Sequence, residues 1–346
     1  MKNYLEFEKE IKNLETEMDK LKSPFGKDGI TEVDTNKIKV TEEEINSKLK
    51  SIYSNLNSWQ KTLVARHEDR PRANFYIKNI FSSFTPLSGD RYFGDDKSVT
   101  AGFGLIGKKS VLIIGQEKGE DLNSRIERNF GMMRPEGYRK SIRLMELANK
   151  FNIPIISFID TPGAYPGVGA EERGQARAIA ENIYEMFSLK TPIISLVIGE
   201  GGSGGALGIG IGDKVAMMEN AWYSVISPEG CASILWRSAE GKEDAAEALK
   251  LTAPSLLELG IVDEVVPEPV GGAHSAPADA IQMVGDFIER SLVELQSVPI
   301  VSLLERRHLK FRQIAQRDGA LRDGVDVENV DKPRKISQTD SSPGRN

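Results

Sequence analysis

The residues whose types and spacing most clearly suggest a binding or catalytic site form a glycine-rich segment at positions 199–213. Around Ser203 its glycines are Gly199, Gly201, Gly202, Gly204 and Gly205. Because glycine lacks a Cβ, a ligand can closely approach the backbone N–H groups of such a segment. The apolar residues 192–198 before it predict a buried strand, and the small apolar residues 206–211 after it predict a tightly packed helix. A strand, a glycine turn and a helix N-terminus place free N–H groups where they can bind an anion or stabilise a developing oxyanion.

The same segment allows two other interpretations. Residues 201–205 fit the G-x-S-x-G pattern of hydrolases, in which a histidine would activate Ser203 as a nucleophile. The chain has three histidines. We expect His67 and His308 at the surface because charged residues flank them, which leaves His274, in a glycine-rich loop, as the candidate base. The second alternative is a glycine cluster that serves packing alone.

An earlier segment repeats this one. Pro-Ile-Ile-Ser occurs at 154–157 and again at 192–195, a spacing of 38 residues. Each copy predicts a strand, a turn rich in glycine or proline, and a helix, which in the first copy covers 171–187. The residues that this helix would turn inward are Ala176, Ile179, Ala180, Ile183 and Phe187. Repetition at this period is typical of stacked, superhelical β/α cores, so we expect the two turns to lie side by side as two candidate anion sites.

The elements around these turns follow from apolar periodicity. Residues 1–65 predict a helical hairpin, packed on the core or on a second subunit, whose second helix starts at a capping box at 41–44 and extends to Trp59. The alternative is a solvated arm with no partner. Residues 66–316 predict the main domain, with a strand at 110–115, a helix at 138–150 and short strands at 214–218, 222–226 and 261–266. Residues 317–346 are polar and predict a disordered tail.

A run of basic residues lies before the first copy of the repeat. Its members are Arg125, Arg128, Arg134, Arg139, Lys140 and Arg143. Such a run is either a solvated face or, because Gly131, Pro135 and Gly137 interrupt it, a set of charges on a shaped loop that binds a ligand. Both interpretations stay open, and Arg134 is the candidate ligand contact.

Composition limits the class of protein. The chain has 346 residues, a net charge of −6 and a single cysteine, Cys231. The acidic balance argues against a general nucleic-acid binder, and one cysteine excludes an internal disulfide or a cysteine-built zinc site. The N-terminus lacks an apolar signal core, and no apolar run reaches the roughly 18 residues of a membrane helix. We therefore expect a cytoplasmic protein without membrane contact.

These segments together resemble a known family. The chain is similar to the α subunits of bacterial-type acetyl-CoA carboxylase carboxyltransferase, which belong to the crotonase-like superfamily. The resemblance rests on RYFGDD at 91–96, NFGMMRPEGYRK at 129–140, FIDTPGAYPG at 158–167, EERGQ at 171–175, the glycine segment at 199–213, SPEG at 227–230 and VPEPVGGAH at 266–274. It extends to about residue 315. Met133, where the family often has proline, and the loop after His274 depart from the pattern, but neither touches the glycine turns.

The resemblance implies an α/β protein with a crotonase-like superhelical β/α core and an N-terminal helical hairpin. It implies that the chain pairs with a separate β subunit, and that carboxybiotin on a biotin carboxyl carrier protein gives its carboxyl group to acetyl-CoA. The product would be malonyl-CoA for fatty-acid synthesis, and biotin carboxylase would be a further partner. The family's zinc ribbon belongs to the β subunit, so no metal is expected in this chain.

The resemblance also implies roles for residues at the two turns. Gly204 and Gly205 would face the ureido oxygen of biotin. The candidate substrate contacts are Gly163 and Ala164 on the neighbouring turn, with Ser203 and Arg134. Two developing oxyanions, one on the thioester and one on the ureido group, need backbone donors rather than side-chain bases.

Two rival functions stay open. One is a self-sufficient crotonase-type hydratase or isomerase, for which Glu171, Glu172 and Glu200 are present near the turns. The other is a non-catalytic scaffold of a carboxylase complex.

Overall fold

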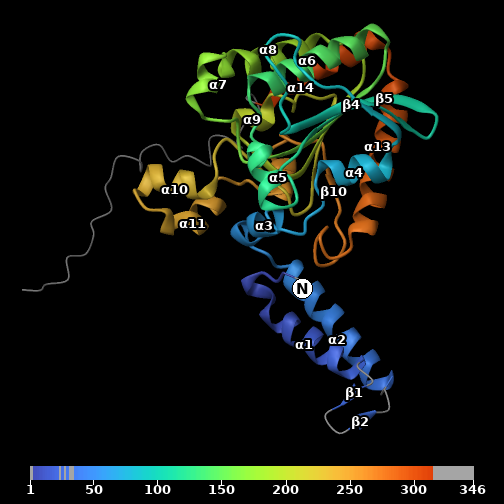
Figure 1. Cartoon of the computed structure of the whole chain (residues 1–346), viewed down its shortest axis with the longest axis vertical. Coiled ribbons are helices and arrows are strands. Elements are labelled where there is room, and N and C mark those ends of the chain that lie inside the picture. Colours follow the sequence, from blue (N-terminus) through green and yellow to red (C-terminus); the bar gives the residue numbers. More distant parts are fainter. Residues whose placement is uncertain (1–2, 23–24, 27–28, 31–34, 315–346) are drawn as a thin grey trace, which may run out of the picture.

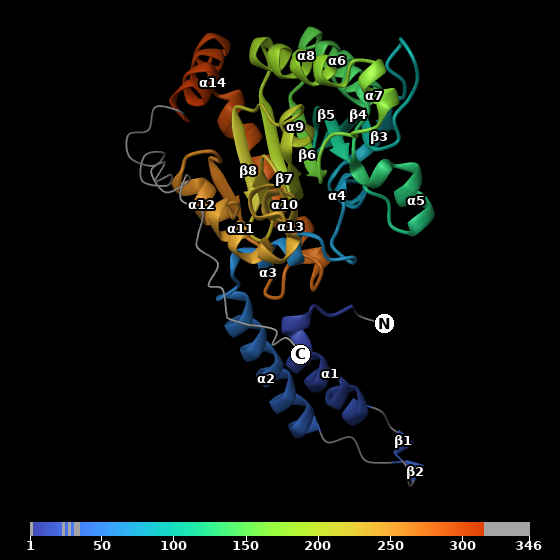
Figure 2. The ribbon, with the colours of Figure 1, turned by 90° about the vertical axis from the view of Figure 1, so that its left-hand side faces the viewer.

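The computed structural model describes residues 3–22, 25–26, 29–30 and 35–314. The tail predicted at 317–346 lies outside these residues. The described chain forms a layered α/β core from which an arm of two helices projects (Figure 1, Figure 2). Within these ranges, no helix has both the length and the apolar character to span a lipid bilayer.

The core is built on one sheet of eight strands. Seven follow the order β10-β8-β7-β6-β5-β4-β3, and β9 pairs with the end of β7. The strands are β3 (Ser82–Pro86), β4 (Val99–Ile106), β5 (Lys109–Gln116), β6 (Ile155–Thr161), β7 (Ile193–Gly202), β8 (Lys214–Met218), β9 (Trp222–Ser224) and β10 (Glu264–Val266). Pairing is parallel from β5 to β10 and antiparallel from β3 to β5. This sheet confirms the predicted α/β class, and the strands predicted at 110–115 and 214–218 are β5 and β8.

β6 and β7 are the two copies of the repeat. Ile155 pairs with Ile193 and Ser157 with Ser195, which is the predicted spacing of 38 residues. The two serine hydroxyls are hydrogen-bonded at 3.0 Å inside the core. Both strands are buried along their whole length, as expected for parallel strands covered on two faces. The repeat therefore places two equivalent strand ends next to each other.

Helices cover both faces of the sheet. α6 (Pro135–Lys150), α8 (Gln175–Ser188) and α14 (Ile300–Ile314) lie on one face, and α4 (Ala73–Ile80) and α13 (Pro277–Gln296) on the other (Figure 1). The shorter helices are α3 (Ser58–Ala65), α5 (Leu122–Glu127), α7 (Val168–Glu172), α9 (Ser203–Leu207), α10 (Pro228–Trp236), α11 (Lys242–Ala248) and α12 (Ala253–Glu258), with 3₁₀ turns η1 (Glu6–Glu8), η2 (Asn129–Gly131) and η3 (Ala239–Gly241).

The single helix predicted at 171–187 is wrong, because the chain forms two helices there. α7 ends before Gly174, whose left-handed φ of 79° separates it from α8. The buried face also differs: it includes the polar Gln175 and Asn182, whereas the predicted Ala176 and Ala180 are exposed. Gln175 points inward because its amide donates hydrogen bonds of 2.8 and 3.0 Å to two backbone carbonyl groups of neighbouring loops.

The N-terminal arm is the predicted hairpin of two helices. α1 (Lys9–Lys22) packs along α2 (Thr35–Tyr53), with the short strands β1 (Phe25–Gly26) and β2 (Gly29–Ile30) between them. The arm points away from the sheet (Figure 2). The capping box at 41–44 is wrong: Thr41 lies inside α2, and its hydroxyl donates to the Lys37 carbonyl at 2.9 Å. Trp59 belongs to the separate α3, and the domain boundaries after residues 65 and 316 remain predictions.

Candidate active site

The glycine segment begins as a strand and not as a turn. β7 continues to Gly202, so its last glycines are strand residues. A Cβ at Gly199 would lie 2.5 Å from the Asp160 carboxylate, and a Cβ at Gly202 would lie 2.2 Å from the Pro162 carbonyl oxygen. These two glycines let β7 approach the chain that leaves β6, and packing alone accounts for them.

The turn itself occurs at Ser203. Its φ of 54° is left-handed, a strained conformation for a residue with a side chain and one that is concentrated at functional sites. The helix predicted at 206–211 is wrong, because α9 starts at Ser203 and ends at Leu207. Gly210 then donates to the Leu207 carbonyl at 3.0 Å in a tight turn. Glycine's low helix propensity favours this early end.

The turn that follows β6 lies directly against α9. A Cβ at Gly205 would be 2.3 Å from the Gly163 carbonyl carbon and 2.5 Å from the Ala164 nitrogen. The prediction that the two turns lie side by side is confirmed. At Gly204, by contrast, the nearest atom to a Cβ would be 3.8 Å away. Since the first N–H groups of a helix have no intrahelical acceptor, α9 presents N–H groups next to the Gly163 turn.

A cavity of about 380 Å³ opens beside Gly204. Ser203 and Gly204 contribute to its lining, and its other walls include Leu207, Tyr223, Leu256 and Ile261. Burial raises the pKa of Tyr223 to about 12, so its phenol stays protonated at neutral pH. Apolar walls with a few polar groups are the usual composition of a small-molecule site.

Arg134 lies beside the first turn. Its guanidinium group is 4.6 Å from the centre of the Tyr165 ring, two residues after Gly163. Arg139 and Lys140 are held in ion pairs with aspartates of the loop before β4. The basic run is therefore partly structural, and Arg134 remains its candidate ligand contact.

A cluster of buried charges lies next to the two turns, and the sequence analysis named only Glu200 among its members. Lys118 Nζ is 2.6 Å from the carboxylates of Asp160 and Glu200, and Arg66 Nε is 2.7 Å from Glu200. Burial raises the pKa of Glu200, but the two cations outweigh it and lower the pKa, so Glu200 is ionised at neutral pH. Around Lys118, the sequence indicates this cluster only by placing a lysine two residues after the buried strand β5. Its ion pairs make Glu200 unsuitable as the proton donor that a hydratase would need.

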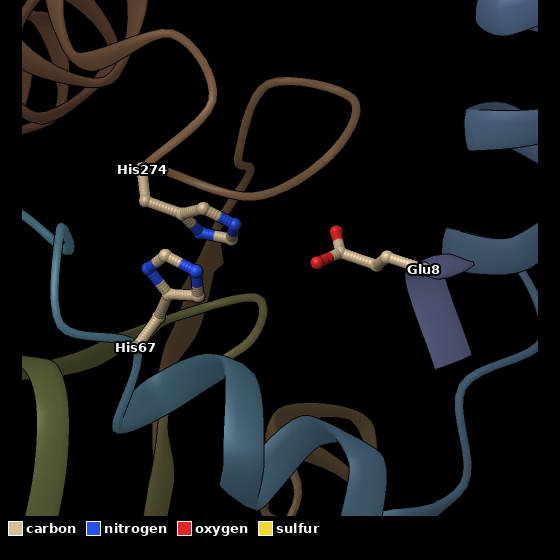
Figure 3. Close-up of side chains that lie close together, drawn as sticks. All are labelled: Glu8, His67 and His274. Atoms are coloured by element: carbon tan, nitrogen blue, oxygen red, sulfur yellow. The ribbon is translucent and has the colours of Figure 1, made fainter. Parts of the chain in front are cut away.

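A second cluster joins the arm to the core (Figure 3). The rings of His67 and His274 stack with centroids 3.8 Å apart and planes 15° apart, and the Glu8 carboxylate faces them. The prediction that His67 lies at the surface is wrong, since it is 5% exposed. Its two ring nitrogens lie 3.1 Å from the Asn3 carbonyl oxygen and the Asp69 N–H group.

The Glu8 and His67 atoms of this second cluster that could bind a metal ion already form hydrogen bonds. Glu8 accepts hydrogen bonds of 2.7 Å from the Tyr53 hydroxyl and from the Leu5 N–H group. Parallel stacked rings do not direct their nitrogen lone pairs toward one point. The cluster therefore holds the arm on the core, and His274, the candidate base for Ser203, belongs to this junction.

The architecture is the crotonase-like fold of acyl-CoA carboxyltransferases. Transcarboxylase 12S, solved with methylmalonyl-coenzyme A and methylmalonic acid bound, matches with a TM-score of 0.52 at 21% identity over 64% of this chain and 42% of that chain. The β subunit of P. aeruginosa geranyl-CoA carboxylase matches with a TM-score of 0.52 at 16% identity over 71% of this chain and 46% of that chain. The chain thus spans less than half of each solved chain, and the likeness is one of fold.

Sequence comparison defines the family. Residues 4–315 match the family described as acetyl co-enzyme A carboxylase carboxyltransferase-like. The acetyl-coenzyme A carboxylase carboxyl transferase subunit alpha of Pelagibacter ubique (strain HTCC1062) is 61% identical over 319 residues, which cover 92% of this chain and 87% of that protein. The corresponding subunit of Agrobacterium fabrum (strain C58) is 49% identical over 317 residues, covering 91% and 99%. The chain belongs to this family of carboxyltransferase subunits, as the resemblance implied.

Proposed function

We propose that the chain is an α subunit that acts with a β subunit to transfer a carboxyl group from carboxybiotin to acetyl-CoA, giving malonyl-CoA for fatty-acid synthesis. The biotin is attached to a biotin carboxyl carrier protein, which biotin carboxylase reloads. The complex works in the cytoplasm, with neither nucleic acid nor membrane as a primary partner, and this chain itself needs no metal. The names of the relatives support the reaction, and the designation alpha supports a second kind of subunit.

The contact of Gly205 with the Gly163–Ala164 turn is the observation that carries the proposal. It brings the N–H groups at the start of α9 next to the Gly163–Ala164 turn. The Gly163 N–H group already donates to Thr161 Oγ1 at 3.2 Å, so the Ala164 N–H group is the donor that this turn would offer. Carboxyl transfer to a thioester develops negative charge on two oxygens. A backbone or side-chain donor aimed at such an oxygen lowers the barrier by roughly 3–4 kcal/mol. We assign Gly204 and Gly205 to the ureido oxygen, and Gly163 and Ala164 to the substrate channel.

The residues around α9 fit the ring system of biotin. When bound, carboxybiotin supplies the carboxyl group that is transferred. Leu207 and Leu256 would contact the apolar part of the rings, while Ser203 and Gly204 offer donors to the polar part. Gly204 lines the cavity, and a Cβ there would lie 3.8 Å from the nearest atom, so the backbone at Gly204 is not crowded. Arg134, beside the first turn, is assigned to substrate binding together with Ser203.

The experiment measures two reactions with three samples: the purified chain alone, its cognate β subunit alone, and the complex of the two. Malonyl-CoA formation from carboxybiotin and acetyl-CoA should be absent for the lone chain and present for the complex. Enoyl-CoA hydration should be absent in both. Transfer by the lone chain would refute the requirement for a β subunit, hydration would establish a hydratase, and transfer by the β subunit alone would make this chain a scaffold.

A further inference from the structure

We propose that Lys118 is a positioning residue for carboxyl transfer, because its ammonium group joins Asp160 to Glu200 and so fixes the spacing of the two turns. This inference rests on the proposed function, in which the turns form the active site. Lys118 is not part of the cavity lining beside Gly204. It acts through the backbone of β6 and β7.

The ammonium group lies where β6 and β7 lose their regular pairing. The last regular pair and the first pair beyond the break are Ile159–Val197 and Thr161–Gly201. Asp160 is therefore opposed by three residues of β7, which form a bulge directly before the glycine turn. The Glu200 N–H group donates to Asp160 Oδ1 at 2.9 Å within this bulge. Because bulges redirect a strand, this one determines where α9 begins.

Lys118 connects the two sides of the bulge. Its Nζ lies 2.6 Å from Asp160 Oδ1 and 2.6 Å from Glu200 Oε1, and the three side chains are 14%, 7% and 9% exposed. Burial lowers the pKa of Lys118, but the two carboxylates outweigh it and raise the pKa, so the ammonium group stays charged. Removing one partner from such a buried group of charges is strongly destabilising.

A neighbouring side chain connects the same segments. Gln116 is fully buried, accepts a hydrogen bond of 3.1 Å from the Asp160 N–H group, and donates one of 2.8 Å to the Gly205 carbonyl. The end of β6 and the middle of α9 are therefore both fixed to the end of β5. Lys118, two residues further on, adds the tie between β6 and β7.

The surrounding charges determine what the loss of Lys118 would do. The charged and titratable groups that face the cluster are Asp160, Glu200, Arg66, Glu229, Arg70, Arg72, Glu117 and Tyr76. Arg66 would still pair with Glu200, whereas Asp160 would lose its ion-pair partner. A buried carboxylate that loses the cation in contact with it either binds a proton or moves toward water. A variant without Lys118 should therefore work best at acid pH.

The test compares Lys118→Met with Lys214→Met in the full chain assembled with the β subunit. Lys214 is the control: its side chain is 15% exposed and also contacts two carboxylates, those of Glu264 and Glu294, which are 26% and 58% exposed. It pairs with Ile194 at the opposite end of β7 from the turns. kcat, KM and melting temperature are measured from about pH 6 to about pH 8.5. We expect kcat of Lys118→Met to fall about tenfold to a hundredfold at the alkaline end and to recover toward acid pH, while Lys214→Met keeps the wild-type profile.

The double variant Lys118→Met/Asp160→Asn separates positioning from direct catalysis and from misfolding. The new amide can still accept the Glu200 N–H group, and no unpaired charge remains, so most of kcat should return with a flat pH profile. A kcat that stays low in the double variant would overturn the positioning role, and so would a wild-type profile for Lys118→Met. Should Lys118→Met fail to fold, the double variant alone decides. A wild-type complex that transfers no carboxyl group would instead refute the proposed function, and this inference with it.

Discussion

Replacing Gly205 by alanine adds one methyl group at the contact between the two turns. The new Cβ would lie 2.3 Å from the Gly163 carbonyl carbon and 2.5 Å from the Ala164 nitrogen, whereas ordinary contacts are 3.4–4 Å. Both opposing atoms belong to the backbone, so no side chain can rotate away. α9 and the Gly163 turn must therefore separate by about 1 Å.

A separation of this size is large on the catalytic scale. A misplacement of about 1 Å costs about a hundredfold in rate, and the loss of one oxyanion donor costs roughly 2.7–4 kcal/mol of barrier. We expect carboxyl transfer by the assembled complex to fall about a hundredfold or more. The same overpacking lowers the free energy of unfolding by about 1–3 kcal/mol.

Gly102→Ala is the control that separates stability from catalysis. Its Cβ would lie 2.1 Å from the Thr85 carbonyl oxygen in β3, so it also overpacks a backbone contact, but at the β3 edge of the sheet, whereas the turns follow the central strands β6 and β7. Both variants should melt at lower temperature, and only Gly205→Ala should lose transfer. The rate is measured on complexes purified as assembled species, below both melting temperatures. A Gly205→Ala complex that assembles and keeps the wild-type rate would refute the assignment of this turn to catalysis.

Three further predictions concern stability. Burial raises the pKa of Asp90, but three backbone N–H groups and Arg139 outweigh it and lower the pKa to about 2. A carboxyl group with a lowered pKa stabilises the fold at any pH above its unfolded pKa of about 4, and this stabilisation is lost as the pH falls through the folded pKa. Asp90→Asn should therefore unfold at lower urea concentration at pH 7, and the difference from wild type should disappear as the pH falls toward 2. Arg70→Met should lower the free energy of unfolding by about 3–5 kcal/mol, since it leaves the fully buried Glu268 carboxylate unpaired, and coincident denaturation curves would contradict this. His67→Leu removes two hydrogen bonds at the junction of arm and core. The free energy of local opening at this junction should fall by about 1–2 kcal/mol, so limited proteolysis should release the arm faster. An unchanged cleavage rate would show that the junction does not hold the arm.

The centre of the fold was predictable because its signal is periodic. Pro-Ile-Ile-Ser recurs after 38 residues, and β6 and β7 pair at that spacing. Two identical strand segments that pair in parallel end near each other, so the repeat and the short turns predict that the turns after β6 and β7 lie side by side. The family motifs predicted the class of reaction, which the comparisons confirm.

Element boundaries were less predictable because distant contacts decide them. Glycines at 199–202 indicate a turn by their weak strand propensity, yet the strand continues, because residues 200–202 pair with β9. Gly199 and Gly202 are needed there because Asp160 and Pro162 occupy the space that a Cβ would need. Gln175 favours an exposed position by its polarity, yet two carbonyl groups on other segments bind it inside. In each case the deciding atom lies on another segment of the chain.

The buried charges show both the limit of sequence analysis and a way past it. Glu200 meets Lys118 from 82 residues away and Arg66 from 134 residues away, and neither residue type alone predicts burial. The repeat changes this reasoning, because it places Asp160 and Glu200, one acidic residue after each copy, at adjacent strand ends. Two carboxylates buried side by side need a cation between them. In a parallel sheet that cation can come from the next strand, and β5 supplies it with Lys118.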